Sequence, residues 1–345
     1  MKKITPVILC GGNGTRLWPR SRATKPKPFL PLIGEETLFE EALRRCGDPE
    51  YFDAPVIVNG AAHLVHVEEQ LGGSPGAHVI IEPSARSTAA AIALAALRLP
   101  HDAIMLVCPS DHHIGDQEAF TAAALSAAAL AGQGWLVSFG IVPESAHTGF
   151  GYIRRGDALG ALGFRVAQFI EKPDQAIAEG FLADGGYSWN SGIFAFRVTD
   201  YLAELERHRP HLIAAVRRSV DDGTAKRHLF YPEPTAFARI MTESVDYAVM
   251  ENTVKAAMVT VDMSWSDIGN WQAVHAARIR DINGNSIIGR AELVDCRNVL
   301  VETDDAHVSV IGLENVVVVV NGGAVLVTTA EGAQKVGKLA CAISQ

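Results

Sequence analysis

The chain has 345 residues, of which 48% are hydrophobic and 20% are charged, so we expect one large and one smaller folded domain rather than a disordered chain. Its formal net charge of -9 argues against a protein that coats nucleic acid. No apolar run approaches the length of a membrane span, and the first residues lack the apolar region of a signal peptide. The cysteines are scattered without metal-site spacing and are expected to be reduced and mostly buried. We therefore predict a cytoplasmic protein without nucleic-acid or membrane partners.

The apolar run from Val7 to Cys10 predicts a buried strand, and a glycine-rich turn follows it. Three of the four residues from Gly11 to Gly14 are glycine, and Arg16 comes two residues later. Glycine permits positive φ and close approach, so successive backbone N–H groups can converge on an anion. Arg16 adds donors matched to phosphate oxygens. The stretch predicts a phosphate-binding loop, with a plain strand-to-loop turn as the alternative.

The residues after this loop exclude two common nucleotide-binding motifs. Leu17 stands where the dinucleotide fingerprint needs its last glycine, and the prolines between Pro19 and Pro31 forbid the helix that must follow. The Walker motif is absent because no Gly-Lys-Ser/Thr follows the glycines. We therefore expect a phosphate loop of another kind, followed by a basic tail that includes Lys27. The same residues argue against a nicotinamide-dependent oxidoreductase.

Helical and strand patterns then alternate at the spacing of βαβ units. Helices are predicted over 37–46, 61–71, 87–97 and 116–131, and strands over 55–58, 79–81, 103–108 and 135–139. We expect Ser87 or Thr88 to cap the third helix. The alternation predicts an α/β fold with a Rossmann-like, mostly parallel (mixed) sheet flanked by helices. Its site should lie at the carboxyl ends of the strands, where Glu82 and Asp111 fall.

The regular alternation of predicted strands and helices ends in the second half of the chain. Strands are predicted over 148–153, 164–172, 190–196 and 256–261, with a helical pattern over 199–218 that breaks near Pro210 and a loop over 264–271 that enters a helix. Beyond about residue 284, Val and Ile alternate with Gly, Asn and Asp, which predicts a small C-terminal β domain, with a β-helix as one form. A last helix is expected over 335–342. We expect a nucleotidyltransferase domain over 1–282 and the β domain over 283–345.

Several of these stretches together resemble one family. Residues 9–19 (LCGGNGTRLWP) and 26–31 (PKPFLP) are similar to the signature of sugar-1-phosphate nucleotidylyltransferases. Residues 169–173 (FIEKP) resemble its sugar-phosphate motif, and 189–194 (WNSGIF) and 265–271 (WSDIGNW) resemble the mannose-1-phosphate guanylyltransferase branch. The resemblance extends from residue 4 to the C-terminus. Bifunctional members carry a further isomerase domain, which we do not expect in these residues.

This resemblance implies a reaction and a set of site residues. GMP passes from GTP to mannose 1-phosphate with Mg²⁺, giving GDP-mannose and pyrophosphate. The implied residues are Arg16 and Lys27 for catalysis, Leu9, Gly11, Gly12, Asn13, Gly14, Thr15, Glu82, Arg86 and Thr88 for the nucleotide, Gly151, Glu171, Lys172 and Asn190 for the sugar phosphate, and Asp111 and Asp267 for the metal. We expect the β domain to support the sugar site or a homodimer, because exposed valine-rich strand edges otherwise invite association.

Glu82 suggests how the base is chosen. Guanine presents N1–H and its 2-amino group as two parallel donors, and a carboxylate accepts both. We therefore expect Glu82 to read guanine. Ser87 departs from the family's usual asparagine, which leaves the nearby base or ribose contacts open.

Other assignments stay open at this stage. Asp111 and Asp267 have helix capping as their alternative, and the adjacent His112 and His113 show no third ligand at zinc spacing. A transferase for another sugar 1-phosphate or base is one rival. A non-catalytic regulatory paralogue that binds a nucleotide sugar is another.

Overall fold

The computed structural model describes residues 2–12, 14–72, 74 and 76–343, and the chain divides into two compact units. The first unit comprises Met1–Gly11, Ala42–Ser110 and Ile114–Trp265, and the second comprises Gly12–Glu41, Asp111–His113 and Ser266–Gln345. Most of the phosphate loop therefore belongs to the same unit as the C-terminal β domain, although the two segments are far apart in the sequence. The predicted boundary at residues 282 and 283 divides the chain along its sequence and stays a prediction.

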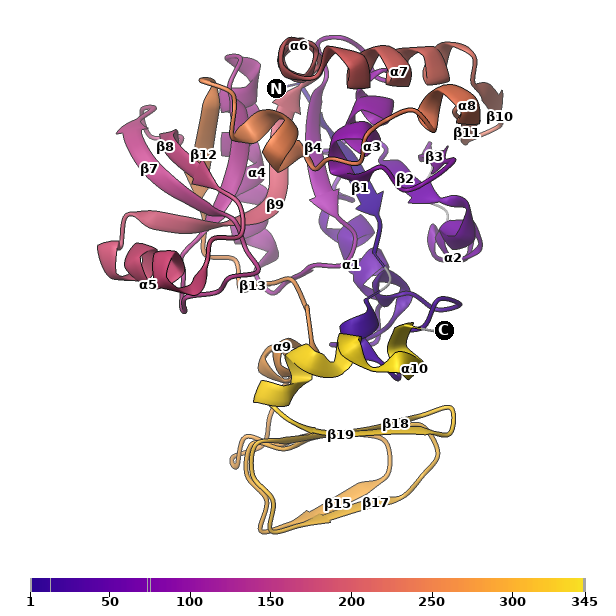
Figure 1. Cartoon of the computed structure of the whole chain (residues 1–345), viewed down its shortest axis with the longest axis vertical. Coiled ribbons are helices and arrows are strands. Elements are labelled where there is room, and N and C mark those ends of the chain that lie inside the picture. The colour runs from indigo at the N-terminus through magenta and orange to yellow at the C-terminus, as the bar shows by residue number, and fades with distance from the viewer. Residues whose placement is uncertain (1, 13, 73, 75, 344–345) are drawn as a thin grey trace. The chain divides into compact units, whose positions relative to one another are not determined.

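The first unit is built on one mixed sheet, which confirms the predicted α/β class (Figure 1). Its strands are β1 (Ile4–Cys10), β2 (Val56–Gly60), β3 (His78–Glu82), β4 (Ile104–Pro109), β6 (Leu136–Ile141), β7 (Tyr152–Ala158), β8 (Phe164–Ile170), β9 (Tyr187–Arg197), β10 (Thr224–Lys226), β11 (Leu229–Tyr231) and β12 (Ala256–Thr260). They lie in the order β10-β11-β3-β2-β1-β4-β9-β6-β12-β8-β7. Strands β3, β2, β1 and β4 are parallel, whereas β9 runs antiparallel to both β4 and β6.

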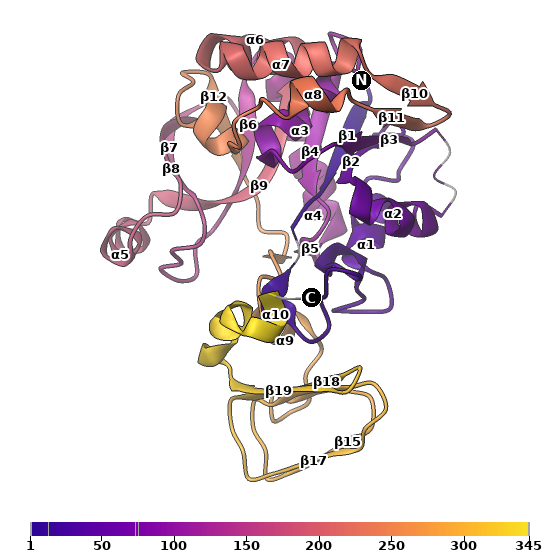
Figure 2. The same cartoon turned by 45° about the vertical axis from the view of Figure 1, so that its right-hand side comes forward.

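Helices cover both faces of this sheet, as the sequence predicts. They are α1 (Leu38–Arg45), where the boundary between the units falls, η3 (Ala61–His63), α2 (Leu64–Gln70), α3 (Ser87–Ala96), α4 (Gln117–Gly132), α5 (Gln175–Asp184), α6 (Val198–His208), α7 (Pro210–Asp221), α8 (Pro234–Phe237) and the π-helix η4 (Asp246–Met250). On β4, Met105 and Val107 join the core with α3, α6 and α7, whereas Leu106 and Cys108 join the core with α4. This alternation is the two-residue period of a strand buried on both faces. Figure 2 shows α6 and α7 side by side, with α3 beneath them.

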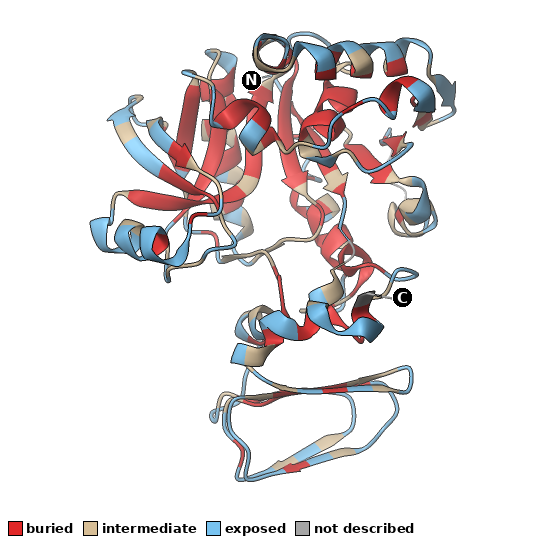
Figure 3. Cartoon of the chain, in the orientation of Figure 1, coloured by how far each residue is buried: buried red, intermediate tan, exposed pale blue. Residues whose placement is uncertain are grey.

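Buried residues fill the central strands of the first unit in Figure 3. The cysteines are free thiols, of which Cys341 is exposed and the other four are buried. Among the described residues, no helix is long and apolar enough to cross a membrane.

The capping prediction for α3 is wrong. Arg86 occupies the cap position without a side-chain hydrogen bond to the helix, and Ser87 has a φ of 67°. A capping residue needs extended backbone, so Ser87 in the left-handed region cannot serve as one. The Thr88 hydroxyl instead accepts a hydrogen bond from the backbone N–H of Val245, at 2.9 Å.

Several elements differ from their predicted form. The strand expected over 148–153 begins only at Tyr152, and α5, β10, β11, α8 and η4 were not predicted. The expected last helix is a 3₁₀ helix, η5 (Glu331–Lys338), followed by α10 (Ala340–Ile343). Apart from α5, which has 10 residues, these elements are short or irregular, so they carry too few turns to give a readable period.

The second unit contains the β domain, which is a β-helix. Its strands are β14 (Ser286–Ile288), β15 (Ala291–Val294), β16 (Leu300–Thr303), β17 (Val308–Ile311), β18 (Val316–Asn321) and β19 (Ala324–Thr329). Strands β14, β16 and β18 are parallel, and β15 pairs with β17 in a separate parallel sheet, so successive coils stack (Figure 1). Strand β19 returns antiparallel along β18 and ends the stack.

The rest of the second unit packs around a small core. It includes the 3₁₀ turns η1 (Thr15–Leu17) and η2 (Lys27–Phe29) and the helix α9 (Trp271–Ala277). Leu17 of η1 and Val336 of η5 are buried in the same cluster as Trp271. The indole N–H of Trp271 donates to the carbonyl oxygen of Trp18 at 2.9 Å. Two-residue strands, β5 (His113–Ile114) and β13 (Trp265–Ser266), lie where the chain passes between the units.

Candidate functional site

The glycine loop is shaped by glycine in two different ways. Gly12 and Gly14 have φ values of 83° and 62°, which side-chain-bearing residues rarely adopt. A Cβ on Gly14 would also overlap the Cβ of Lys27. Gly14 is therefore needed for both backbone conformation and space. Asn13 lies outside the described residues.

Lys27 joins two other predicted residues in the second unit. Its side chain is buried, and its Nζ donates to Asp111 Oδ2 at 2.8 Å and to the carbonyl oxygen of Asp267 at 2.5 Å. Burial disfavours the charged form of Asp111, but the nearby Lys27 ammonium and the His112 ring outweigh it, so the pKa of Asp111 is lowered. The structure therefore brings together an ammonium and two predicted metal-binding aspartates that lie far apart in sequence.

The chemistry of this donor set fits a magnesium ion that also binds phosphate. Mg²⁺ takes few carboxylates and completes its coordination with phosphate oxygens and water. Asp267 is not a helix cap, because its Oδ1 accepts from the N–H of Gly269 at 3.0 Å and Asn270 caps α9. The described residues contain no group of three or more His, Cys, Asp or Glu side chains that could hold a metal, so a closed zinc site is not found among them.

Arg16 lies on the exposed face of η1. Its Nη1 donates to the side-chain oxygen of Gln334, on η5, at 3.0 Å. Sequence reasoning missed Gln334, because nothing in a polar stretch near the C-terminus indicates a partner 318 residues earlier.

The first unit holds the remaining predicted nucleotide residues. Glu82 ends β3, and its buried Oε1 has no hydrogen-bond partner in the part of the chain that the structure describes. Burial raises the pKa of Glu82 to about 7. A buried acceptor without a donor costs free energy, which a ligand that supplies the donor recovers.

Three other predicted nucleotide residues make contacts within the protein. Arg86 Nη2 donates to the carbonyl oxygen of Ala238 at 2.8 Å, so Arg86, like Thr88, ties the start of α3 to the segment before η4. Leu9 accepts from the backbone N–H of Ser110 at 3.1 Å. Their ligand roles, and those of Gly11 and Thr15, stay predictions.

The predicted sugar-phosphate residues gather in the first unit. A Cβ on Gly151 would overlap Glu171 Oε2 and lie 3.3 Å from the Cβ of Asn190, so the absence of a side chain at 151 makes room for the Glu171 carboxylate. Glu171 Oε1 lies 3.0 Å from Lys172 Nζ, while its buried Oε2 has no hydrogen-bond partner within the described ranges. The side chain of Lys172 pairs with Glu171 but is largely exposed, so its ammonium is accessible to an anion from solvent.

Asp246 joins this cluster and was missed from the sequence. Its Oδ1 accepts from Asn190 Nδ2 at 2.8 Å, and Asn190 Oδ1 accepts from the hydroxyl of Ser138 at 2.8 Å. Asn190 therefore has its amide orientation fixed by the protein, with one N–H left for a ligand. Burial raises the pKa of Asp246, and burial together with the Asp246 charge raises that of Glu171. No signal marked Asp246, because the π-helix that carries it has no readable sequence period.

Comparison with known proteins identifies the family of this chain. The nucleotidyl transferase family profile matches residues 5–283, and the profile of the MannoseP isomerase/GMP-like beta-helix domain matches residues 289–340. The chain belongs to the nucleotidyl transferase family. The resemblance drawn from the motifs and the expected β-helix are both confirmed.

Relatives of this nucleotidyl transferase match along nearly its whole length. A mannose-1-phosphate guanylyltransferase of Sinorhizobium fredii is 40% identical over 98% of this chain and 67% of its own length. The xanthan biosynthesis protein XanB of Xanthomonas campestris is 42% identical over 97% of this chain and 72% of its own. A mannose-1-phosphate geranyltransferase structure from Thermus thermophilus matches with a TM-score of 0.89 and 31% identity, covering 100% of both chains.

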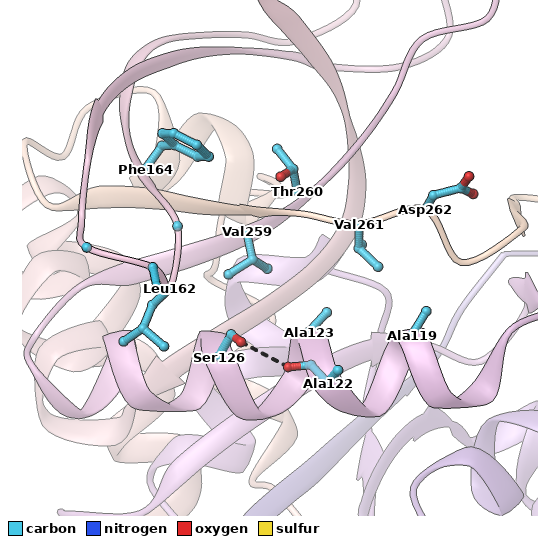
Figure 4. A pocket seen from close by; sticks show the side chains of 13 residues that line it. Ala119, Ala122, Ala123, Ser126, Leu162, Phe164, Val259, Thr260, Val261 and Asp262 are labelled. Carbon is cyan, nitrogen blue, oxygen red and sulfur yellow. Dashed lines mark hydrogen bonds between the residues drawn. The ribbon is translucent and has the colours of Figure 1, made fainter.

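Two cavities of the first unit differ in their relation to the site. One of about 570 Å³ is lined by polar side chains that include Lys172, Glu251 and Ser87, and so adjoins the sugar-phosphate cluster. The other, of about 380 Å³, lies between α4 and β12 (Figure 4). It is lined mainly by small or apolar side chains, and the hydroxyl of Ser126 donates a hydrogen bond to the carbonyl oxygen of Ala122. The transferase site residues are absent from this second cavity.

Proposed function

We propose that this nucleotidyl transferase transfers GMP from GTP to mannose 1-phosphate and releases pyrophosphate. The observation that carries the proposal is Glu82, whose buried Oε1 has no hydrogen-bond partner among the described residues. An ionised carboxylate accepts both N1–H and the 2-amino group of guanine. Uracil and thymine present only one such N–H between two carbonyl oxygens, which a carboxylate repels. The names of the curated relatives support the sugar substrate.

The chemistry requires alignment and charge more than proton transfer. The phosphate of the sugar is an anion near neutral pH, so its oxygen attacks the α-phosphorus of GTP without a general base. The new P–O bond forms as the bond to the bridging oxygen breaks, and pyrophosphate leaves with that oxygen. Arg16 and Lys27 supply donors and positive charge to the phosphates as negative charge grows on the leaving group. The backbone N–H groups of Gly11 to Thr15 add further donors.

The two aspartates and the sugar-phosphate cluster complete the proposal. Asp111 and Asp267 would hold Mg²⁺, which when bound adds positive charge on the phosphate oxygens. Lys172 offers its ammonium to the phosphate of the sugar, and Glu171 offers its unpartnered oxygen to sugar hydroxyls. Asn190 donates its remaining N–H. We also expect the protein to be cytoplasmic and to form a homodimer. Sedimentation of the full chain would test the dimer.

One assay separates this proposal from its rivals. Pyrophosphate release is measured across a grid of nucleoside triphosphates and sugar 1-phosphates, with and without Mg²⁺. The proposal requires the highest kcat/KM for GTP with mannose 1-phosphate. A maximum at another pair identifies a sibling transferase. No release with any pair, together with nucleotide-sugar binding by calorimetry, identifies a regulatory paralogue.

Replacing Glu82 with glutamine is expected to raise KM for GTP at least tenfold at pH 8, because the amide N–H₂ opposes the donors of guanine. The wild-type KM should fall about tenfold between pH 6 and pH 8 as Glu82, with a pKa of about 7, loses its proton. The variant should lack this component. Steady-state KM for GTP at each pH measures both effects.

Stability provides a second readout for the same substitution. The folded-state pKa of Glu82 is raised, so folding favours its protonated form and the free energy of unfolding falls as pH rises from about 4.5 to 7. Glu82→Gln should therefore raise the free energy of unfolding at pH 8 by about 1–3 kcal/mol. Glu144→Gln, an exposed isosteric control, should change neither property. Equal loss of affinity for GTP and UTP in the Glu82 variant would contradict the guanine assignment.

Gly151→Ala is expected to raise KM for mannose 1-phosphate about tenfold and leave KM for GTP within twofold. The added methyl group takes the space of the Glu171 carboxylate and displaces it from the sugar-phosphate cluster. The matched control is Gly180→Ala on α5, where a Cβ meets open space and helix propensity favours alanine. Initial rates with each substrate varied in turn would show the split. A uniform rise in both KM values would argue for general disruption instead.

A further inference from the structure

The phosphate-loop turn η1 rests against the C-terminal 3₁₀ helix η5 within the second unit. Gln334 Oε1 accepts from Arg16 Nη1 at 3.0 Å. Gly337 lies beneath the same side chain, because a Cβ there would come within 3.0 Å of Arg16 Cγ and 3.2 Å of Thr15 Oγ1. Buried Leu17 and Val336 belong to the same core cluster. The contact between η1 and η5 thus combines close side-chain packing with a hydrogen bond at its exposed edge.

The chemistry of the acceptor is informative. An exposed arginine has many rotamers, and fixing the guanidinium in one of them costs side-chain entropy. Gln334 restrains the guanidinium through a neutral oxygen and leaves its charge intact. A glutamate would hold it as well but would neutralise it and compete with phosphate. In the described part of the chain, Arg16 has no carboxylate within ion-pair distance, so its other N–H groups remain available to an anion.

We infer that Gln334 is a positioning residue for Arg16, which it holds ready for the triphosphate of the nucleotide. This inference rests on the proposed role of Arg16. It assigns to the segment that follows the β-helix a part in the reaction, carried out through the phosphate loop. Gln334 touches no substrate in this scheme, so its removal should act on turnover only through Arg16.

A double-mutant cycle tests this dependence. Gln334→Met keeps the length of the side chain and removes the acceptor, and it should lower kcat about tenfold while KM for the sugar phosphate stays within twofold. In an Arg16→Ala background the same change should have no further effect on kcat. Gln334→Glu restores an acceptor but neutralises the charge, so it should recover the positioning and raise KM for GTP about fivefold. Lys335→Met, which alters the neighbouring exposed side chain, is the control.

Two results would overturn the inference: an unchanged kcat in Gln334→Met, or an equal loss of kcat with and without Arg16, which would indicate a merely structural role. A readout independent of turnover is the ¹⁵N NMR spectrum of the arginine side chains, with Arg16 assigned by Arg16→Lys. Restricted rotation should give resolved Nη signals for Arg16 in the wild type and averaged ones in Gln334→Met. Identical signals would refute the positioning even if no substrate pair were turned over, whereas inactivity of the wild type would count against the proposed function alone.

Discussion

Replacing Lys27 with methionine is expected to lower kcat for GMP transfer by about a thousandfold. The ammonium is the only group described that joins the Asp111 carboxylate to the main chain of Asp267, and the Lys27 side chain is buried. In the proposed mechanism, its loss removes positive charge from the reacting phosphates, where one such donor is worth about 10²–10³ in rate. It also releases the two aspartates from their common neighbour. Single-turnover rates at saturating GTP, mannose 1-phosphate and Mg²⁺ would measure the effect.

The same substitution should cost stability. Removing one member of a buried ion pair leaves the other charge uncompensated, and because the Asp111 side chain is 25% exposed we expect a loss of about 2 kcal/mol. Lys2→Met is the matched control, since Lys2 pairs with Asp102 at an exposed position. That change should leave both stability and kcat unaltered. A Lys27→Met enzyme with kcat within tenfold of the wild type would refute a catalytic role for this residue.

Arg16→Ala is expected to lower kcat by about 10²–10³ and to shift Tm by less than about 2 °C. Arg16 is exposed and its one described side-chain hydrogen bond goes to Gln334, so the fold loses little without it. If the glycine loop were only a turn, the outcome would be reversed. Turnover and thermal unfolding measured on the same preparation separate the two interpretations.

Arg20 offers the contrasting control four residues along the chain. Its Nε lies 2.6 Å from the buried Oε1 of Glu302, in the β-helix. Arg20→Ala should therefore lower the free energy of unfolding by about 1–3 kcal/mol and leave kcat at permissive temperature within threefold of the wild type. Arg278 also binds Glu302, which limits the loss. A large fall in kcat for both variants would indicate that any change near the loop disturbs turnover.

The sheet of the first unit could be predicted because the local sequence pattern indicates its strands and helices. Apolar runs such as the one in β4 end at proline or aspartate, and α4 begins at Asp116, whose side chain accepts from the N–H of Ala119. The site could be predicted where its residues sit in long motifs next to these elements. Glu82 at the end of β3 is the clearest case, and its orphan oxygen supports a ligand role that stays to be tested.

What escaped prediction depends on contacts between distant segments or on irregular backbone. The Asp246 carboxylate lies in a π-helix, and its value to the site depends on Asn190, 56 residues away. Asn190 was expected to offer both a donor and an acceptor, but Ser138 and Asp246 each take one of these groups. Ser87 sits in the left-handed region, which no propensity for serine suggests. Each case depends on tertiary structure that a local pattern does not encode.

The pairing of the phosphate loop with η5 has a consequence for the newly made chain. Arg16 and Gln334 are 318 residues apart, so at roughly 5–20 residues per second the ribosome finishes the loop some 15–60 s before its supporting segment exists. The sheet of the first unit is built from local βαβ units. Most of its strands therefore have their neighbouring strands available before η5 is made. The loop leaves the ribosome long before η5, and it therefore becomes ordered only after this later segment exists. Competence for nucleotide transfer should arise only after η5 has been made and has packed against the loop.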